Sequence, residues 1–276
     1  MAISRMKRWA GMALDFVWQE ALCCIFPIAV LVLIYLSQVI RIPGLPRYDV
    51  LFVACIFIQA LMVRFRLETL DEARTIALFH VIGLCLELFK VNQGSWSYPE
   101  GAYLKFAGVP LFSGFMYASV GSYVVQAWKR FDLKMSSWPA DWTVVLVCVL
   151  LYANFFTLHY IPDLRWPIIA MICIAFRKVW VSFTVSSQRL RMPLLTSFLL
   201  IGIAVWIAEN IGTRLHAWQY PYQESGWTHV DFGKLSSWSL MVILSVVLVA
   251  ELKRVKEQLT QSIESCGADI PVCPNV

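Results

Sequence analysis

Two glutamates occupy matching places in a pair of similar motifs. Glu87 is followed by Trp-x-Tyr-Pro at residues 96–99, and Glu209 is followed by Trp-x-Tyr-Pro at residues 218–221, with the same spacing. Each glutamate lies near the end of an apolar run. A charged side chain in a bilayer costs roughly 2.5 to 3.5 kcal/mol on insertion scales, so two at matching positions need an explanation. The pattern predicts a pocket in which the two carboxyl groups meet.

A pair of carboxyl groups can divide acid and base roles if one stays protonated and the other stays ionised. Lys90 lies three residues after Glu87, and Arg214 lies five residues after Glu209 near the expected end of its helix. We expect each cation to pair with its glutamate and to tune its ionisation. The expected catalytic residues are therefore Glu87, Glu209, Lys90 and Arg214. The alternative is that both ion pairs only lock the structure together.

The aromatic residues of the motifs predict a substrate-binding rim. Proline removes a backbone donor and holds the preceding residue extended, so it can aim the tyrosine back over the carboxylate. The expected substrate-binding residues are Trp96, Tyr98, Asn210, Trp218, Tyr220, His80 and Tyr117. The competing interpretation is an ordinary interfacial belt of Trp and Tyr, with His80 as a packed interior histidine.

The composition indicates a multi-pass membrane protein. Of 276 residues, 59% are hydrophobic and only 15% are charged, and the mean hydropathy is +0.66. The net charge of +5 comes from short basic loops rather than a basic stripe, so nucleic-acid binding is not expected. No nucleotide, zinc or serine-hydrolase signature occurs, and we expect neither a cofactor nor a metal. Cys266 and Cys273 fit no zinc spacing and are left without a role.

Eight apolar runs predict an all-α bundle of about eight transmembrane helices. They cover residues 22–40, 49–63, 75–91, 106–127, 141–159, 166–182, 194–213 and 235–252. Residues 1–20 are expected to form an amphipathic interfacial helix, and residues 257–276 a cytoplasmic tail. Most of the 23 Lys and Arg residues fall on one side of these spans, which predicts that both termini are cytoplasmic.

The motif repeat extends to the whole chain. Ile42-Pro43 after the first span is echoed by Ile161-Pro162 after the fifth, again about 120 residues later. This predicts two four-helix units, residues 21–134 and 135–256. Because four spans is an even number, the units would run parallel, and each would bring one glutamate helix to a shared axis.

Several segments resemble a known family. They lie at residues 79–83, 87–90, 94–100, 109–118 and 208–210, within a similarity that runs from about Trp18 to Lys253. On these segments the chain resembles the YoaT-like bacterial integral membrane family, catalogued as a domain of unknown function. That resemblance implies a bacterial inner-membrane protein. The membrane glutamate, the aromatic turn and the following Val109-Pro110-Leu111 are also similar to carotenoid hydratases, whose acid chemistry acts on lipophilic polyenes.

Three functions stay open at this point. The first is acid–base chemistry on a membrane lipid or another lipophilic small molecule, of the hydratase, isomerase or cyclase kind. The second is a proton- or cation-coupled transporter that loads its ion on the same glutamates. The third is a structural subunit whose buried charges only hold the fold together. Substrate, reaction and oligomeric state do not follow from the sequence.

Overall fold

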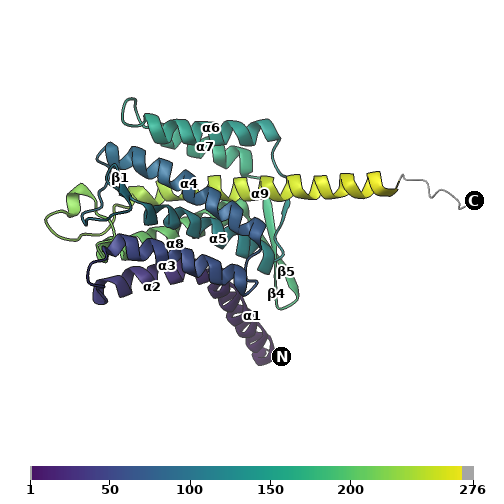
Figure 1. Ribbon diagram of the computed structural model, residues 1–276. Helices are drawn as coiled ribbons and strands as arrows, with labels where there is room; N and C mark the ends of the chain where they lie inside the picture. Colours follow the sequence, from purple (N-terminus) through teal and green to yellow (C-terminus); the bar gives the residue numbers. More distant parts are fainter. Residues whose placement is uncertain (1, 269–276) are drawn as a thin grey trace, which may run out of the picture.

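The computed structural model describes residues 2–268, with side chains for residues 6–251 and 253. This part of the chain is mostly helical (Figure 1). Its nine α-helices are α1 (Ala2–Cys23), α2 (Ile25–Val39), α3 (Arg47–Arg64), α4 (Leu70–Asn92), α5 (Gly114–Arg130), α6 (Asp141–Thr157), α7 (Arg165–Phe176), α8 (Leu194–Arg214) and α9 (Gly233–Ala268).

Each of the eight predicted apolar runs overlaps one of the helices α2 to α9. In two of the runs, part of the sequence forms another kind of structure. The fourth run begins with a hairpin of β1 (Lys105–Phe106) and β2 (Val109–Pro110), followed by the 3₁₀ turn η1 (Leu111–Ser113), so α5 starts only at Gly114. In the sixth run α7 ends at Phe176, and the chain continues into a strand.

Three helical stretches are long and apolar enough to cross a bilayer: α4, α8 and residues Gly233–Glu251 of α9. Met6–Cys23 of α1 and the whole of α2 make a fourth if they count as one span, although the chain bends by 63° between them. Helices α6 and α7 are apolar but shorter. Because a hydrocarbon core about 30 Å thick needs about 20 helical residues, the number of eight spans stays a prediction.

The prediction of an all-α fold is wrong in two places. One is the β1–β2 hairpin, and the other is a small antiparallel sheet. Its strands are β3 (Lys134–Ser136), β4 (Trp180–Val185) and β5 (Gln188–Pro193), in the order β3–β4–β5. Less and more exposed side chains alternate along β4, which is the period of a strand rather than a helix. Ser186 and Ser187 join β4 to β5 with φ of 48° and 63°, as a tight two-residue hairpin turn requires.

In the centre of the bundle, helices that are neighbours in the sequence pack against each other. Helix α4 packs along α5, α8 packs along α9, and α5 also contacts α9. The α2–α3 pair packs against α5 through α2, and the α6–α7 pair packs against α9 through α6; these pairs lie at opposite edges of the bundle in Figure 1. The start of α1 and the end of α9 point to the end of the bundle that carries the β4–β5 hairpin, whereas β1 lies at the other end (Figure 1).

The two chain ends match the predicted organisation in part. Residues 2–20 of the predicted amphipathic segment are helical within α1, and they expose large apolar side chains such as Trp9, Leu14 and Trp18. Its position at a membrane interface stays a prediction. The side chain of Cys266 and the whole of Cys273 lie outside the described residues.

Candidate functional site

Helix α4 carries Glu87 and ends in a turn that reverses the chain. The helix begins at a capping box, in which Thr69 Oγ1 accepts from the Glu72 amide and the Glu72 carboxylate accepts from the Thr69 amide. At its other end Gly94 has φ +68°, and the amides of Gly94 and Ser95 donate to the carbonyls of Val91 and Lys90. This is a Schellman motif, and it folds the following residues back toward Glu87.

Helix α8 ends in the same way after Glu209. His216 has φ +51°, its amide donates to the Thr213 carbonyl, and the Ala217 amide donates to the Gly212 carbonyl. The matching Schellman turns explain the fixed distance between each glutamate and its Trp-x-Tyr-Pro segment. Both segments must leave their helices along the same path.

Glu87 is 1% exposed and accepts three hydrogen bonds from aromatic side chains. Trp96 Nε1 and Tyr98 Oη both donate to Oε2, each at 2.7 Å. Tyr117 Oη donates to Oε1 at 2.9 Å. Neutral donors therefore meet both oxygens of this carboxyl group.

Glu209 is 3% exposed and has a similar surrounding. Tyr220 Oη donates to its Oε1, and Trp238 Nε1 donates to its Oε2. The donors of the two sites correspond along the chain, because Tyr220 follows Glu209 as Tyr98 follows Glu87, eleven residues later. Trp238 stands about 120 residues after Tyr117, and the rings of these two residues lie 6.4 Å apart.

The two motifs touch each other directly. The Ser97 amide donates to the Gln219 carbonyl at 2.9 Å, and the Gln219 amide donates to the Ser97 carbonyl at 3.0 Å, forming an antiparallel bridge. The Trp96 ring stands edge-on to the Tyr220 ring, with centroids 6.1 Å apart. The first motif thus contacts the donor that binds the second glutamate.

A single cavity of about 570 Å³ is lined by both glutamates, and we call it the glutamate cavity. Trp96, Tyr117, Trp218, Tyr220 and Trp238 contribute aromatic walls at this end. Mainly apolar residues of α1, α2, α5, α8 and α9 line the rest. The expectation that the two glutamates meet around one pocket agrees with this geometry.

The expected ion pairs are wrong. Among the described residues neither glutamate has a cation within 4.0 Å. Lys90 Nζ instead donates to the Phe155 carbonyl at 2.9 Å and lies 3.0 Å from His159 Nε2, so this cation ties α4 to the end of α6. Arg214 is exposed and stacks over Trp227 at 5.0 Å. Neutral donors already occupy both carboxyl groups, which leaves the cations to find other acceptors.

Three expected substrate-binding residues do not line the glutamate cavity: Tyr98, Asn210 and His80. Tyr98 reaches Glu87 from outside that lining. Asn210 donates to the Trp206 carbonyl at 2.8 Å and accepts from the Val230 amide at 2.9 Å, so it fastens a loop to α8. His80 packs 4.3 Å from the Phe115 ring. Trp218 does line the cavity and packs against Gly212, where a side chain would collide with its ring.

Two residues near the site were missed from the sequence. Trp238 binds Glu209, and its position about 120 residues after Tyr117 is the signal that could have identified it. Lys234 Nζ lies over the Tyr220 ring at 4.7 Å and over the Trp96 ring at 5.5 Å. This ammonium group therefore lies over one aromatic ring of each motif.

The kind of donor at each carboxyl oxygen determines whether that oxygen can carry a proton. An indole N–H only donates, so Glu87 Oε2 and Glu209 Oε2 must act as acceptors. A tyrosine hydroxyl donates or accepts, so a carboxyl proton can reside on either Oε1. Burial, followed by the nearby Glu209 carboxylate, raises the pKa of Tyr220 well above its ordinary value. Burial and Glu87 do the same to the pKa of Tyr98, so both phenols keep their protons.

The comparisons with known proteins agree with the resemblance read from the sequence. The profile of a family described as "Protein of unknown function (DUF817)" matches residues 13–246. The chain is also similar to "Uncharacterized protein YoaT" of Bacillus subtilis (strain 168), with 51% identity over 243 residues, or 88% of this chain and 92% of that relative. No solved structure matches the chain.

Proposed function

Because the chain belongs to the DUF817 family, whose description names no activity, we propose a function from the site itself. The protein is an integral membrane enzyme that performs acid–base chemistry on a lipophilic substrate held between Glu87 and Glu209. One observation carries this proposal: two buried carboxyl groups, each held by neutral donors, line a single and mainly apolar cavity.

The proposed setting is the inner membrane of a bacterium, with about eight spans and both termini in the cytoplasm. The similarity to a bacterial protein and the three long apolar helices support this setting. The reciprocal Ser97–Gln219 bridge and the equivalent glutamate donors support two parallel units, residues 21–134 and 135–256. The cavity would then lie on the outward side, near the axis that relates the units.

The chemistry follows from the proton that each Oε1 can hold. A protonated glutamate gives its proton to one carbon of a substrate double bond, and the electron pair of that bond forms the new C–H bond. The second glutamate, as a carboxylate, takes a proton from a neighbouring carbon, and the double bond re-forms in a new place. One glutamate loses a proton and the other gains one, so isomerisation balances without an oxidant or reductant.

The aromatic walls suit the intermediate of this reaction. A carbocation between the two transfers is attracted by the faces of Trp and Tyr rings. Trp96, Tyr117, Trp218, Tyr220 and Trp238 surround the carboxyl groups and would also exclude water from the cation. If water were admitted instead, it would trap the same cation, and the outcome would be hydration.

The test is deuterium incorporation, since it needs no knowledge of the substrate. Membranes that contain the protein are incubated in heavy water, and their lipid extract is analysed by mass spectrometry. Wild type should label at least one lipid at carbon, whereas Glu87→Gln and Glu209→Gln should not.

Glu68→Gln is the matched control for that test. Glu68 is also 2% exposed and accepts from Ser122 Oγ at 2.5 Å, but it does not line the glutamate cavity. Its variant should label lipid as wild type does. Equal labelling by all variants, or no labelling by the folded wild type, would refute the proposed enzymatic activity.

A proton- or cation-coupled transporter is the second candidate. The observation in its favour is that neither glutamate has a cation within 4.0 Å among the described residues, which leaves the carboxyl groups able to bind a proton or a small cation. A pH-driven uptake into vesicles that both Gln variants abolish would support transport. A structural subunit would instead lose its folded form in both variants.

A further inference from the structure

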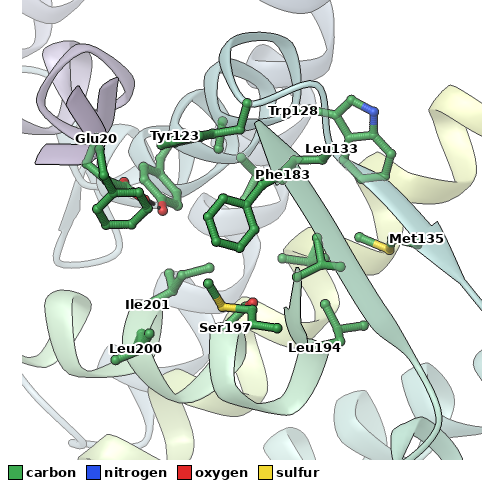
Figure 2. Close-up of a pocket in the computed structure, with 17 residues that line it drawn as sticks. Glu20, Tyr123, Trp128, Leu133, Met135, Phe183, Leu194, Ser197, Leu200 and Ile201 are labelled. Carbon is green, nitrogen blue, oxygen red and sulfur yellow. Dashed lines mark hydrogen bonds between the residues drawn. The ribbon is translucent and has the colours of Figure 1, made fainter. Parts of the chain in front are cut away.

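The far end of the glutamate cavity carries a second polar pair, Glu20 of α1 and Tyr123 of α5. Tyr123 Oη donates to Glu20 Oε2 at 3.1 Å. Both residues line the glutamate cavity and also a neighbouring cavity of about 110 Å³, which we call the inner cavity. Figure 2 shows Glu20 beside Tyr123, with Ile201 and Leu200 on the other side of the inner cavity.

The two polar ends are separated by an apolar stretch. Leu200 and Glu209 both line the glutamate cavity and are nine residues apart along α8, which is about 13 Å at 1.5 Å per residue. This is close to half of a hydrocarbon core about 30 Å thick. The side chains between the ends include Val30, Leu31 and Val205, which offer no hydrogen bonds.

On the side of α2 and α8, some residues that line the cavity also reach the outer surface of the protein. The outer ends of these helices are joined, because Gln38 of α2 donates to the Leu215 carbonyl at the end of α8. Arg47 of α3 strengthens this junction, since its Nη2 donates to the same carbonyl at 2.9 Å and to the Ile34 carbonyl of α2 at 3.3 Å. Farther inward, Ile28 is 48% exposed and Leu200 is 54% exposed, and both line the cavity. A molecule dissolved in the bilayer would therefore meet the cavity between these two residues.

Glu20 has hydrogen-bonding capacity left over. A carboxylate offers about four acceptor sites, and Tyr123 is the one donor to Glu20 within the described side chains. An acceptor of this kind matches a hydroxyl group and repels a phosphate or a carboxylate. The pair is thus suited to a neutral alcohol rather than to a phospholipid headgroup.

We propose that Glu20 and Tyr123 form a second polar subsite, which binds a hydroxyl group at the far end of a single-chain lipophilic ligand and thereby selects ligands by length. This inference rests on the proposed function, since it assumes that the reacting end of the same ligand lies between Glu87 and Glu209. The ligand comes from the bilayer and enters between α2 and α8.

The experiment compares two homologous series of probes on the purified full-length protein. Primary alcohols and α,ω-diols, from octane to octadecane derivatives, are titrated while tryptophan fluorescence is recorded, because Trp96, Trp218 and Trp238 line the cavity. At one chain length the diol should bind about tenfold more tightly than the alcohol, as one added hydrogen bond to a charged group implies.

Two variants test the assignment of that second hydroxyl. Glu20→Leu should abolish the advantage of the diol, and Tyr123→Phe, which keeps the ring, should reduce it. Glu68→Gln, outside the cavity, should retain it. A diol that is no better than its alcohol at any length, or an advantage that survives both variants, overturns the subsite.

The same titration separates this failure from a failure of the proposed function. If alcohols bind but diols gain nothing, only the second subsite is wrong. If no alcohol of any length binds to folded wild type, the lipophilic ligand itself is wrong, and the enzyme proposal fails with it.

Discussion

Ser97 and Gln219 exchange two backbone hydrogen bonds, of 2.9 and 3.0 Å, although they lie in motifs that are far apart in the sequence. Each is the second residue of a Trp-x-Tyr-Pro segment, so the bridge sets the two segments antiparallel at one point. Their flanking tyrosines then reach back to Glu87 and Glu209. This bridge is what joins two separate helix ends into one site.

Removing the Tyr98 hydroxyl should destabilise the protein. Tyr98 is 3% exposed and donates to the buried Glu87, and removing one partner of a buried hydrogen bond costs about 1 to 3 kcal/mol. We expect Tyr98→Phe to lower the free energy of unfolding by an amount in this range, measured by thermal or denaturant unfolding in detergent. Tyr103→Phe is the control, because Tyr103 is 76% exposed and should change stability little. Equal effects of the two variants would contradict the role given to the Tyr98 hydroxyl.

Gly94 and His216 occupy the equivalent left-handed position of the two Schellman turns. Substitutions at these two residues should therefore change the melting temperature in opposite directions. A non-glycine residue in the left-handed region costs roughly 1 to 2 kcal/mol, so His216→Gly should raise the melting temperature. Gly94→Ala should lower it for the same reason, although nothing lies within 4 Å of the added methyl group. Gly101→Ala is the control, since that glycine has neither a positive φ nor a close neighbour. A destabilised His216→Gly variant would mean that the histidine side chain makes a contribution of its own.

The contact between Lys90 and His159 should make stability depend on pH. Burial, then the charges of Lys90 and Lys234, lowers the pKa of His159 from 6.5. Because the folded-state pKa lies below the unfolded one, this stability is fully present above about pH 6.5 and is lost as the pH falls through the folded-state pKa. Unfolding curves between neutral and mildly acidic pH should show this loss in wild type and a smaller loss in His159→Gln. An identical pH profile in the two proteins would show that His159 does not cause the pH dependence of stability.

The sequence predicted the parts of the site that depend on helix period and spacing. Glu87, Glu209, Tyr98 and Tyr220 come together as expected, because a glutamate near a helix end and a tyrosine after a fixed turn must face each other. The ion pair of Glu87 with Lys90 failed, since helical spacing gives the shared face but not which neighbouring helix supplies the better acceptors. That acceptor is the Phe155 carbonyl of α6, far away in the sequence.

Long-range contacts also explain what else was missed. Trp238 reaches Glu209 from α9, and only the packing of α8 on α9 determines that contact. The sixth predicted span, residues 166–182, includes the first three residues of β4 because Trp180 and Val181 are apolar, whereas the side chains of the strand alternate in burial. Glu20 looked like one polar residue of an amphipathic helix. Its place at a cavity follows from the 63° bend that lays α1 against α5.

Filling the mouth of the glutamate cavity should block it without unfolding the protein. Ala204 lines the cavity on α8 and is exposed, so a large side chain there can enter the opening without displacing buried neighbours. We expect Ala204→Trp to lose both lipid binding and the deuterium labelling in heavy water. Ile207→Trp adds the same side chain three residues further along α8, at a position that is 50% exposed and outside the cavity, and it should keep both. If Ala204→Trp folds and still binds and labels lipid as wild type does, the substrate does not use this opening, and the route between α2 and α8 is wrong.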